Sequence, residues 1–82
     1  MIRETISLTF AEVFRSSMKK DPPAVADDTV LLDSGLDSLG FAILVTRLED
    51  TLGFDPFTLS EEAVYPQTFG EFIRFYERFA PR

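Results

Sequence analysis

Apolar residues recur at helical spacing in three separate stretches of this 82-residue chain, and this pattern most limits the folds it can adopt. Residues three and four positions apart share one face of a helix, so each stretch predicts one buried stripe. No alternating run is bounded by hairpin turns, so strands are not expected. The sequence therefore predicts an all-α helical bundle, with residues 1–82 as a single domain. Three long helices are expected, with a short helix between the second and the last and a long loop after the first.

The first predicted helix should end near Lys20, because Asp21-Pro22-Pro23 cannot continue a helix. The residues expected on its buried stripe are Ile6, Phe10, Val13, Phe14 and Ser17. Residues 21–36 form the long loop. Its apolar members should be held against the core, and these are Val30, Leu31, Leu32 and Leu36.

The second predicted helix begins around Asp37 or Ser38 and runs to about Leu52, where Gly53 suits a left-handed C-terminal cap. Its expected buried stripe comprises Phe41, Leu44, Val45, Leu48 and Leu52. Asp55-Pro56 is expected to break the chain. A short helical turn should follow over residues 60–64, capped by Ser60 or Thr58.

The last predicted helix opens on Thr68 and Glu71, which have the spacing of a capping box. Its expected buried stripe is rich in aromatic residues and comprises Phe69, Phe72, Ile73, Tyr76 and Phe79. The phenylalanine-rich stripes could fill the interior or line a cavity, and the sequence alone favours neither.

The chain contains no Cys and no His, which excludes whole classes of chemistry. Disulfides, thiolate metal sites and Ser–His or Cys–His triads cannot be built from it. No catalytic residue and no metal site is visible in the sequence. The longest unbroken apolar run, Phe41 to Val45, is far too short to span a membrane. The first residues lack the layout of a signal peptide. A cytoplasmic protein without membrane insertion is therefore expected.

Negative charge is concentrated in the middle of the chain. Residues 21–62 carry ten acidic residues and only Arg47 as a base, although the whole chain has a net charge of −6. Such a segment indicates a positively charged partner and argues against nucleic acid, whose phosphates need clustered Lys and Arg. The alternative is that the acidic residues only keep a small protein soluble.

The segment Asp33-Ser34-Gly35-Leu36-Asp37-Ser38-Leu39 carries the most specific signal. It places the Ser38 hydroxyl on a tight turn that leads into a helix, and Gly35 permits the turn. The free amides and partial positive charge of a helix N-terminus favour a phosphate ester on that serine. On spacing alone, the alternative is that Asp37 or Ser38 simply caps the helix.

Gly-Leu-Asp-Ser-Leu, at residues 35–39, resembles the prosthetic-group attachment motif of acyl carrier proteins. The resemblance extends from Leu31 to Leu52, and the length and helix order match over nearly the whole chain. It implies that Ser38 is the covalent attachment site for 4′-phosphopantetheine, added by a transferase that uses coenzyme A and Mg²⁺. The terminal thiol of that group then holds an acyl thioester, so the chain is a carrier and not an enzyme.

The second helix departs from the best-known fatty-acid carriers on its outer face, because Gly40 and Ile43 stand where those carriers often have acids. The resulting surface combines apolar residues with acids. The residues predicted to dock partners are Asp37, Leu39, Ile43, Thr46, Glu49 and Asp50. Alternatively, Leu39 and Ile43 only contact neighbouring loops.

The resemblance thus implies a discrete carrier dedicated to a specialised fatty-acid or polyketide-type pathway, and Gly35 favours the polyketide type. The implied partners are a phosphopantetheinyl transferase and the acyl-loading and acyl-processing enzymes, and the protein is expected to be a monomer. A peptidyl or aminoacyl carrier is the alternative within the same class. An unmodified helical interaction module, in which Ser38 only caps a helix, is the alternative from another class.

Overall fold

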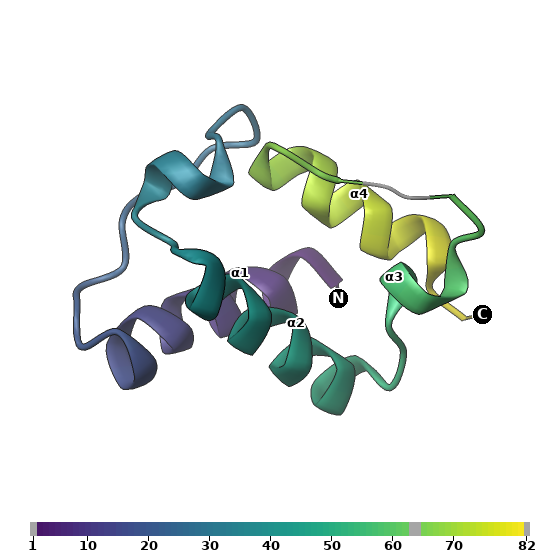
Figure 1. The fold of residues 1–82 in the computed structure, drawn as a ribbon, viewed down its shortest axis with the longest axis horizontal. Coiled ribbons are helices and arrows are strands. Elements are labelled where there is room, and N and C mark those ends of the chain that lie inside the picture. Colours follow the sequence, from purple (N-terminus) through teal and green to yellow (C-terminus); the bar gives the residue numbers. More distant parts are fainter. Residues whose placement is uncertain (1, 63–64, 82) are drawn as a thin grey trace.

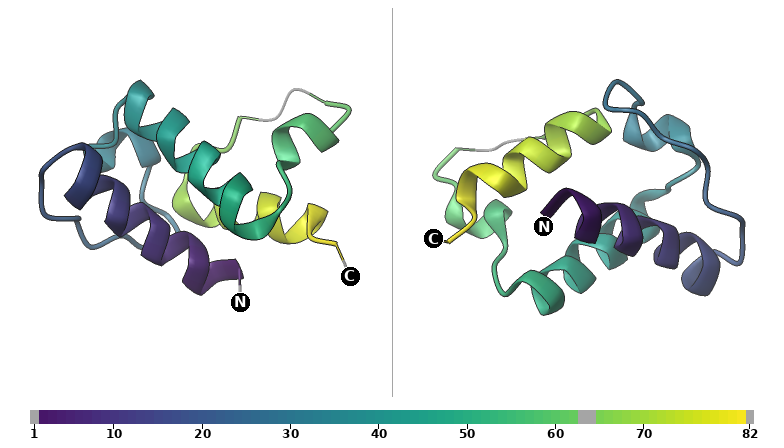
Figure 2. Two further views of the ribbon diagram at one scale, coloured as in Figure 1. Left: turned by 90° about the horizontal axis from the view of Figure 1, so that it is seen from below. Right: turned by 180° about the vertical axis from the view of Figure 1, so that it is seen from behind.

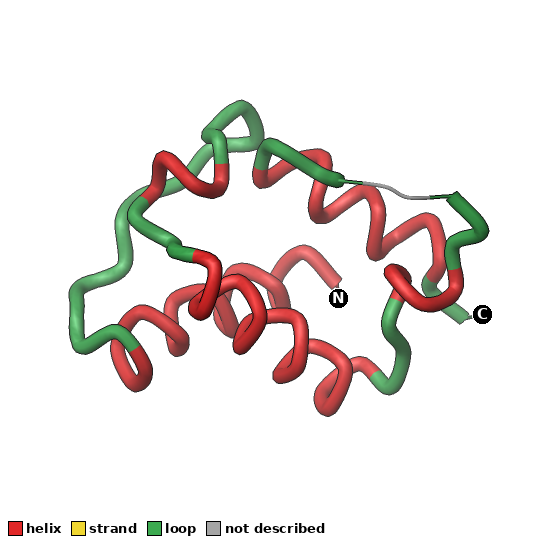
Figure 3. Tube along the Cα trace, in the orientation of Figure 1, coloured by secondary structure: helices red, strands yellow, loops and turns green. Residues whose placement is uncertain are grey.

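A computed structural model describes residues 2–62 and 65–81. These residues form four α-helices: α1 (Ile2–Glu12), α2 (Ser38–Leu52), α3 (Pro56–Leu59) and α4 (Phe69–Phe79). A π-helical turn, η1 (Val13–Ser17), follows α1, and a 3-10 turn, η2 (Leu31–Ser34), precedes α2. Helices and loops account for the described chain in Figure 3, which contains no strand. The predicted all-α bundle of three longer helices and one short helix is confirmed.

α1 and α2 lie side by side and run in opposite directions, and α4 packs against α1 (Figures 1 and 2). α3 packs against α4. The core between these helices is apolar and aromatic, with Phe10, Leu44 and Phe72 almost completely buried. Phe75 is also buried, although the sequence pattern did not single it out, and its ring centroid lies 4.9 Å from that of Phe57.

The first helical segment ends earlier than predicted, at Ser17, because its last turn is a π-helix. The amide of Met18 donates to the carbonyl of Val13 at 3.1 Å, and Lys19 then adopts a left-handed backbone conformation with a φ of 57°. A π-turn holds more residues than an α-turn, so it rotates the following side chains. Ser17 is therefore exposed, and its expected place on the buried stripe is wrong.

The loop before α2 is held against the start of α4 by backbone hydrogen bonds. Leu31 donates its amide proton to the carbonyl of Gln67 at 2.8 Å, and Phe69 donates to Thr29 at 2.9 Å. Leu31 is buried as predicted, and so is Leu36. The expectation that Val30 and Leu32 also lie in the core is wrong.

Val30 is 40% exposed and Leu32 is 65% exposed. The 3-10 turn that begins at Leu31 turns one leucine of the pair inward and the next one outward. Two apolar side chains are thereby left on the surface just before α2. The exposed Leu32 becomes part of the site described below.

The short helix lies before its predicted position. α3 spans Pro56–Leu59, whereas residues 60–62 are not helical and residues 63–64 lie outside the described part of the chain. Asp55 caps α3 by accepting the amide proton of Phe57 at 2.9 Å. The Asp55-Pro56 pair begins this helix rather than only breaking the chain, because proline at the first helical position loses no hydrogen bond and has the φ that a helix needs.

The capping box at the start of α4 is confirmed. The Glu71 amide donates to the Thr68 hydroxyl at 3.1 Å, and the Thr68 amide donates to the Glu71 carboxylate at 3.2 Å. The reciprocal pair satisfies two amides that a helix end leaves free. The capping box therefore fixes where α4 begins, and the long loop before α2 is hydrogen-bonded to that end of α4.

Candidate functional site

The attachment motif forms a tight turn into α2. Gly35 has a φ of 101°, in the left-handed region that glycine adopts without strain, which confirms its predicted role in the turn. Asp37 is the N-cap residue of α2, and its carboxylate accepts the Gly40 amide proton at 2.7 Å. Ser38 is the first residue of the helix and is exposed.

The Ser38 hydroxyl is free within the described part of the chain, because it makes no hydrogen bond to any residue there. By contrast, the hydroxyl of the neighbouring Ser34 donates to the carbonyl of Leu31. Ser60 is engaged as well, since it donates to the carbonyl of Glu62 at 3.0 Å and accepts the Glu62 amide at 3.2 Å. Of these three serines, Ser38 is the one whose hydroxyl is available for modification.

The surroundings of Ser38 fit a phosphate ester. Phe41 donates the first intrahelical bond, to the carbonyl of Asp37 at 2.9 Å, so the amides of Ser38 and Leu39 precede the helical ladder. Free amides and the positive end of the helix dipole favour an anion there. The Asp37 carboxylate is engaged with the Gly40 amide. Capping by Asp37 and modification of Ser38 are therefore compatible.

Gly40 is buried and does not belong to the outer face on which the sequence interpretation placed it. A Cβ atom at this position would meet Leu36 Cδ1 at 3.0 Å, Asp37 Oδ1 at 3.1 Å and Met18 Sδ at 3.1 Å. The missing side chain thus lets α2 approach the end of the first helical segment while Asp37 keeps its cap. This packing reason depends on Met18, which is distant in the sequence.

Five of the six predicted docking residues are exposed, namely Asp37, Leu39, Thr46, Glu49 and Asp50. Leu39 is 70% exposed. Ile43 differs, because it is partly buried and packs against the core. It lines a small crevice with Met18 at the boundary between η1 and α2, so its expected exposure is wrong.

The outer face of α2 also includes Ala42, which the sequence reasoning missed and which is exposed. The buried stripe centres on Leu44 and Leu48 rather than on the half-buried Phe41 and Val45. This places the opposite face between Ala42 and Thr46, with Ile43 at its edge.

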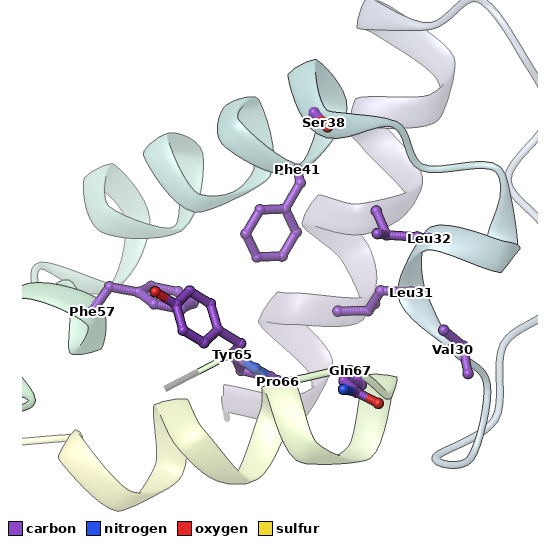
Figure 4. A pocket seen from close by; sticks show the side chains of 9 residues that line it. All are labelled: Val30, Leu31, Leu32, Ser38, Phe41, Phe57, Tyr65, Pro66 and Gln67. Carbon is purple, nitrogen blue, oxygen red and sulfur yellow. The ribbon is translucent and has the colours of Figure 1, made fainter. Parts of the chain in front are cut away.

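A cavity of about 450 Å³ opens beside Ser38 (Figure 4). Its walls come from α2, η2, α3 and the chain segment before α4, and they are mainly apolar. Phe41 projects from α2 into the space, Leu32 and Leu31 face it from η2, and Gln67 lies on the side opposite Ser38. The volume falls in the range of about 300–1,000 Å³ that is usual for small-molecule sites.

Comparison with known proteins agrees with this geometry. Residues 9–65 match the family model of the phosphopantetheine attachment site. The structure is similar to the solution structure of MacpD, an acyl carrier protein from Pseudomonas fluorescens involved in mupirocin biosynthesis. The TM-score is 0.79 at 26% sequence identity, and the match covers 99% of this chain and 72% of that one. No curated protein sequence matches the chain.

The chain belongs to the phosphopantetheine attachment site family and is an acyl carrier protein. Its cofactor is covalent 4′-phosphopantetheine, and the protein is a carrier rather than an enzyme. Carriers of this kind interact with a transferase and with processing enzymes. None of the described helices has the length and apolar character that crossing a membrane requires.

Proposed function

We propose that this protein holds acyl intermediates as thioesters on a 4′-phosphopantetheine arm attached to Ser38. The observation that carries the proposal is the free, exposed hydroxyl of Ser38 at the N-terminus of α2, within the matched motif. When attached, the group supplies the thiol that the chain lacks, because the sequence contains no Cys. The role of the chain is to present that thiol to other enzymes.

The attachment step is a phosphoryl transfer from coenzyme A. The Ser38 Oγ forms a bond to the phosphorus that carries the pantetheine side of the pyrophosphate, and the bond from that phosphorus to the bridging oxygen breaks. The leaving group is 3′,5′-ADP, and the serine proton passes to a base of the transferase. The exposed position of Ser38 leaves its oxygen accessible for this attack.

The docking surface in this proposal is the outer face of α2 beside Ser38. Leu39 and Ala42 provide an apolar centre, and Asp37, Glu49 and Asp50 provide acids around it. Acids at the rim favour encounter with a basic partner, and a desolvated apolar side chain contributes to the bound state. The partners are a phosphopantetheinyl transferase and enzymes that load and process the acyl group. Ile43 contributes at the edge through its exposed part.

A dedicated pathway, rather than general fatty-acid synthesis, is the second part of the proposal. It is supported by the lack of an acid at Ile43, at the edge of the outer face of α2. MacpD, a structurally similar carrier, is involved in mupirocin biosynthesis, which is in keeping with a specialised polyketide-type role. Loading by an acyl-transferring enzyme, but not by an amino-acid-adenylating enzyme, is the expected behaviour. The reverse result would indicate a peptidyl or aminoacyl carrier.

The proposal is tested by intact-mass measurement after incubation with coenzyme A, Mg²⁺ and a broad-specificity transferase. The protein should gain one phosphopantetheinyl group, and Ser38→Ala should gain none while keeping its helical circular dichroism. Ser34→Ala is the matched control and should be modified normally. If the unaltered protein gains no phosphopantetheinyl mass, the proposal is refuted in favour of an unmodified helical interaction module in which Ser38 only caps a helix.

A further inference from the structure

The cavity beside Ser38 has a lining that suits a group tethered at its edge. Ser38 itself lines the cavity, and Phe41 lies one helical turn further along α2 on the same side. Leu32 faces them from η2 and is 65% exposed, although leucine is usually buried. An apolar surface therefore begins directly at the attachment residue.

The chemistry of phosphopantetheine matches the order of these residues. Next to the phosphate, after one methylene, the arm carries a carbon with two methyl groups, and two amides follow before the thiol. The two methyl groups are therefore the first apolar part of the arm, and Phe41 and Leu32 are apolar residues that line the same cavity as Ser38. The amides lie further from Ser38, as does the side-chain amide of Gln67 on the opposite side of the cavity.

We propose that the arm itself, rather than the acyl cargo, occupies this cavity, with its paired methyl groups between Phe41 and Leu32 and its amides toward Gln67. This inference rests on the proposed attachment at Ser38. A tether fixes the arm at an effective concentration in the millimolar range, so weak apolar contacts suffice to populate the folded-back position. The acyl chain is attached at the far end of the arm, so the part of the arm next to Ser38, and not the acyl chain, occupies the mouth of the cavity.

Occupation of the cavity also accounts for two features of the structure. The exposed Leu32 gains an apolar partner, and the half-buried Phe41 is covered on the side that faces the cavity. Phe41 is supported from behind by Phe72, whose ring centroid lies 5.7 Å away. The wall on which the arm rests is therefore part of the packed core.

The test is nuclear magnetic resonance of the full chain carrying the unacylated arm with labelled methyl groups, after intact mass has verified one added group. The methyl protons of the arm should show nuclear Overhauser effects to the Phe41 ring and the Leu32 methyl groups. Amide signals of Leu32 and Gln67 should shift between the unmodified and modified protein, whereas those of Leu8, on the far helix α1, should not.

Substitution of Leu32 provides the decisive variant, because its exposure keeps the fold independent of it. Leu32→Asn should lose most of the methyl contacts. Leu8→Asn is the matched control, since Leu8 is 61% exposed on α1 and does not line the cavity, and it should keep them. A modified protein whose arm shows no contacts, or shows them only after acylation, overturns the inference but leaves attachment at Ser38 standing. Failure to modify Ser38 overturns both.

Discussion

Asp37 has two separable roles, and substituting it tests both the cap and the docking surface. Its carboxylate accepts the Gly40 amide at 2.7 Å and caps α2. Asp37→Ala removes the acceptor and should cost about 1 kcal/mol of stability, within a range of about 0.5–2 kcal/mol. For a domain of this size, each kcal/mol lowers the melting temperature by about 4–8 °C. Asp37→Asn keeps an acceptor at the same position.

The asparagine variant loses only the interaction of the carboxylate charge with the helix dipole, about 0.3–1 kcal/mol at an exposed position. Its stability should therefore lie between those of the unaltered protein and Asp37→Ala. Both variants remove the same charge beside Ser38. Both should slow modification by the transferase to a similar extent at low salt, and the difference from the unaltered protein should shrink as salt rises.

Thermal unfolding followed by circular dichroism measures the first effect, and the initial rate of modification at two salt concentrations measures the second. Glu77→Gln removes one exposed acid from α4 and serves as the control for net charge. If Asp37→Asn slows modification no more than Glu77→Gln, the charge of Asp37 does not guide docking. If Asp37→Asn is as unstable as Asp37→Ala, the capping argument is wrong.

Three further predictions concern the core. The Tyr76 hydroxyl is buried without a hydrogen-bond partner among the described residues, so Tyr76→Phe should raise the free energy of unfolding by about 1 kcal/mol in urea titrations. Burial also raises the pKa of Tyr76, so the free energy of unfolding should fall as pH rises above about 10, and it should fall less in Tyr76→Phe. Gly40→Ala should destabilise the protein by about 1 kcal/mol, because overpacking costs about 1–3 kcal/mol and exceeds the gain in helix propensity. A variant more stable than the unaltered protein would contradict the close packing around Gly40. Leu44→Glu should unfold the domain, because it places a charge in the core. In urea titrations, Ile43→Glu should lower the unfolding midpoint moderately, and Leu39→Glu should leave it nearly unchanged. Equal effects of Leu44→Glu and Ile43→Glu would show that Ile43 is fully buried.

The features that the sequence predicts correctly are those determined by residues close together in the chain. The capping box of Thr68 and Glu71, the left-handed Gly53 with a φ of 83° and the start of α2 at Ser38 all depend on residues within one helical turn. The helical period likewise identified buried residues such as Leu44 and Ile73. Local signals of this kind were enough to give the fold and to place Ser38, the proposed attachment site, at the start of α2.

The features that the sequence missed depend on residues that meet only in the folded protein. Gly40 is needed because Met18 packs against it, and Ile43 turns toward the same end of the first helical segment. The π-turn that exposes Ser17 changes the helical period, so a spacing of three and four residues no longer predicts which side chains are buried there. The cavity beside Ser38 could not be foreseen either, because its walls come from four separate segments.

Peptide mapping of the modified protein tests the central proposal most directly. Trypsin cleavage after Lys20 and Arg47 releases one peptide that contains both Ser34 and Ser38. Fragmentation of this peptide should place the whole phosphopantetheinyl mass on Ser38, since the Ser34 hydroxyl is engaged with the carbonyl of Leu31. Modification on Ser34, or on a peptide that lacks Ser38, would contradict the assignment of the attachment site.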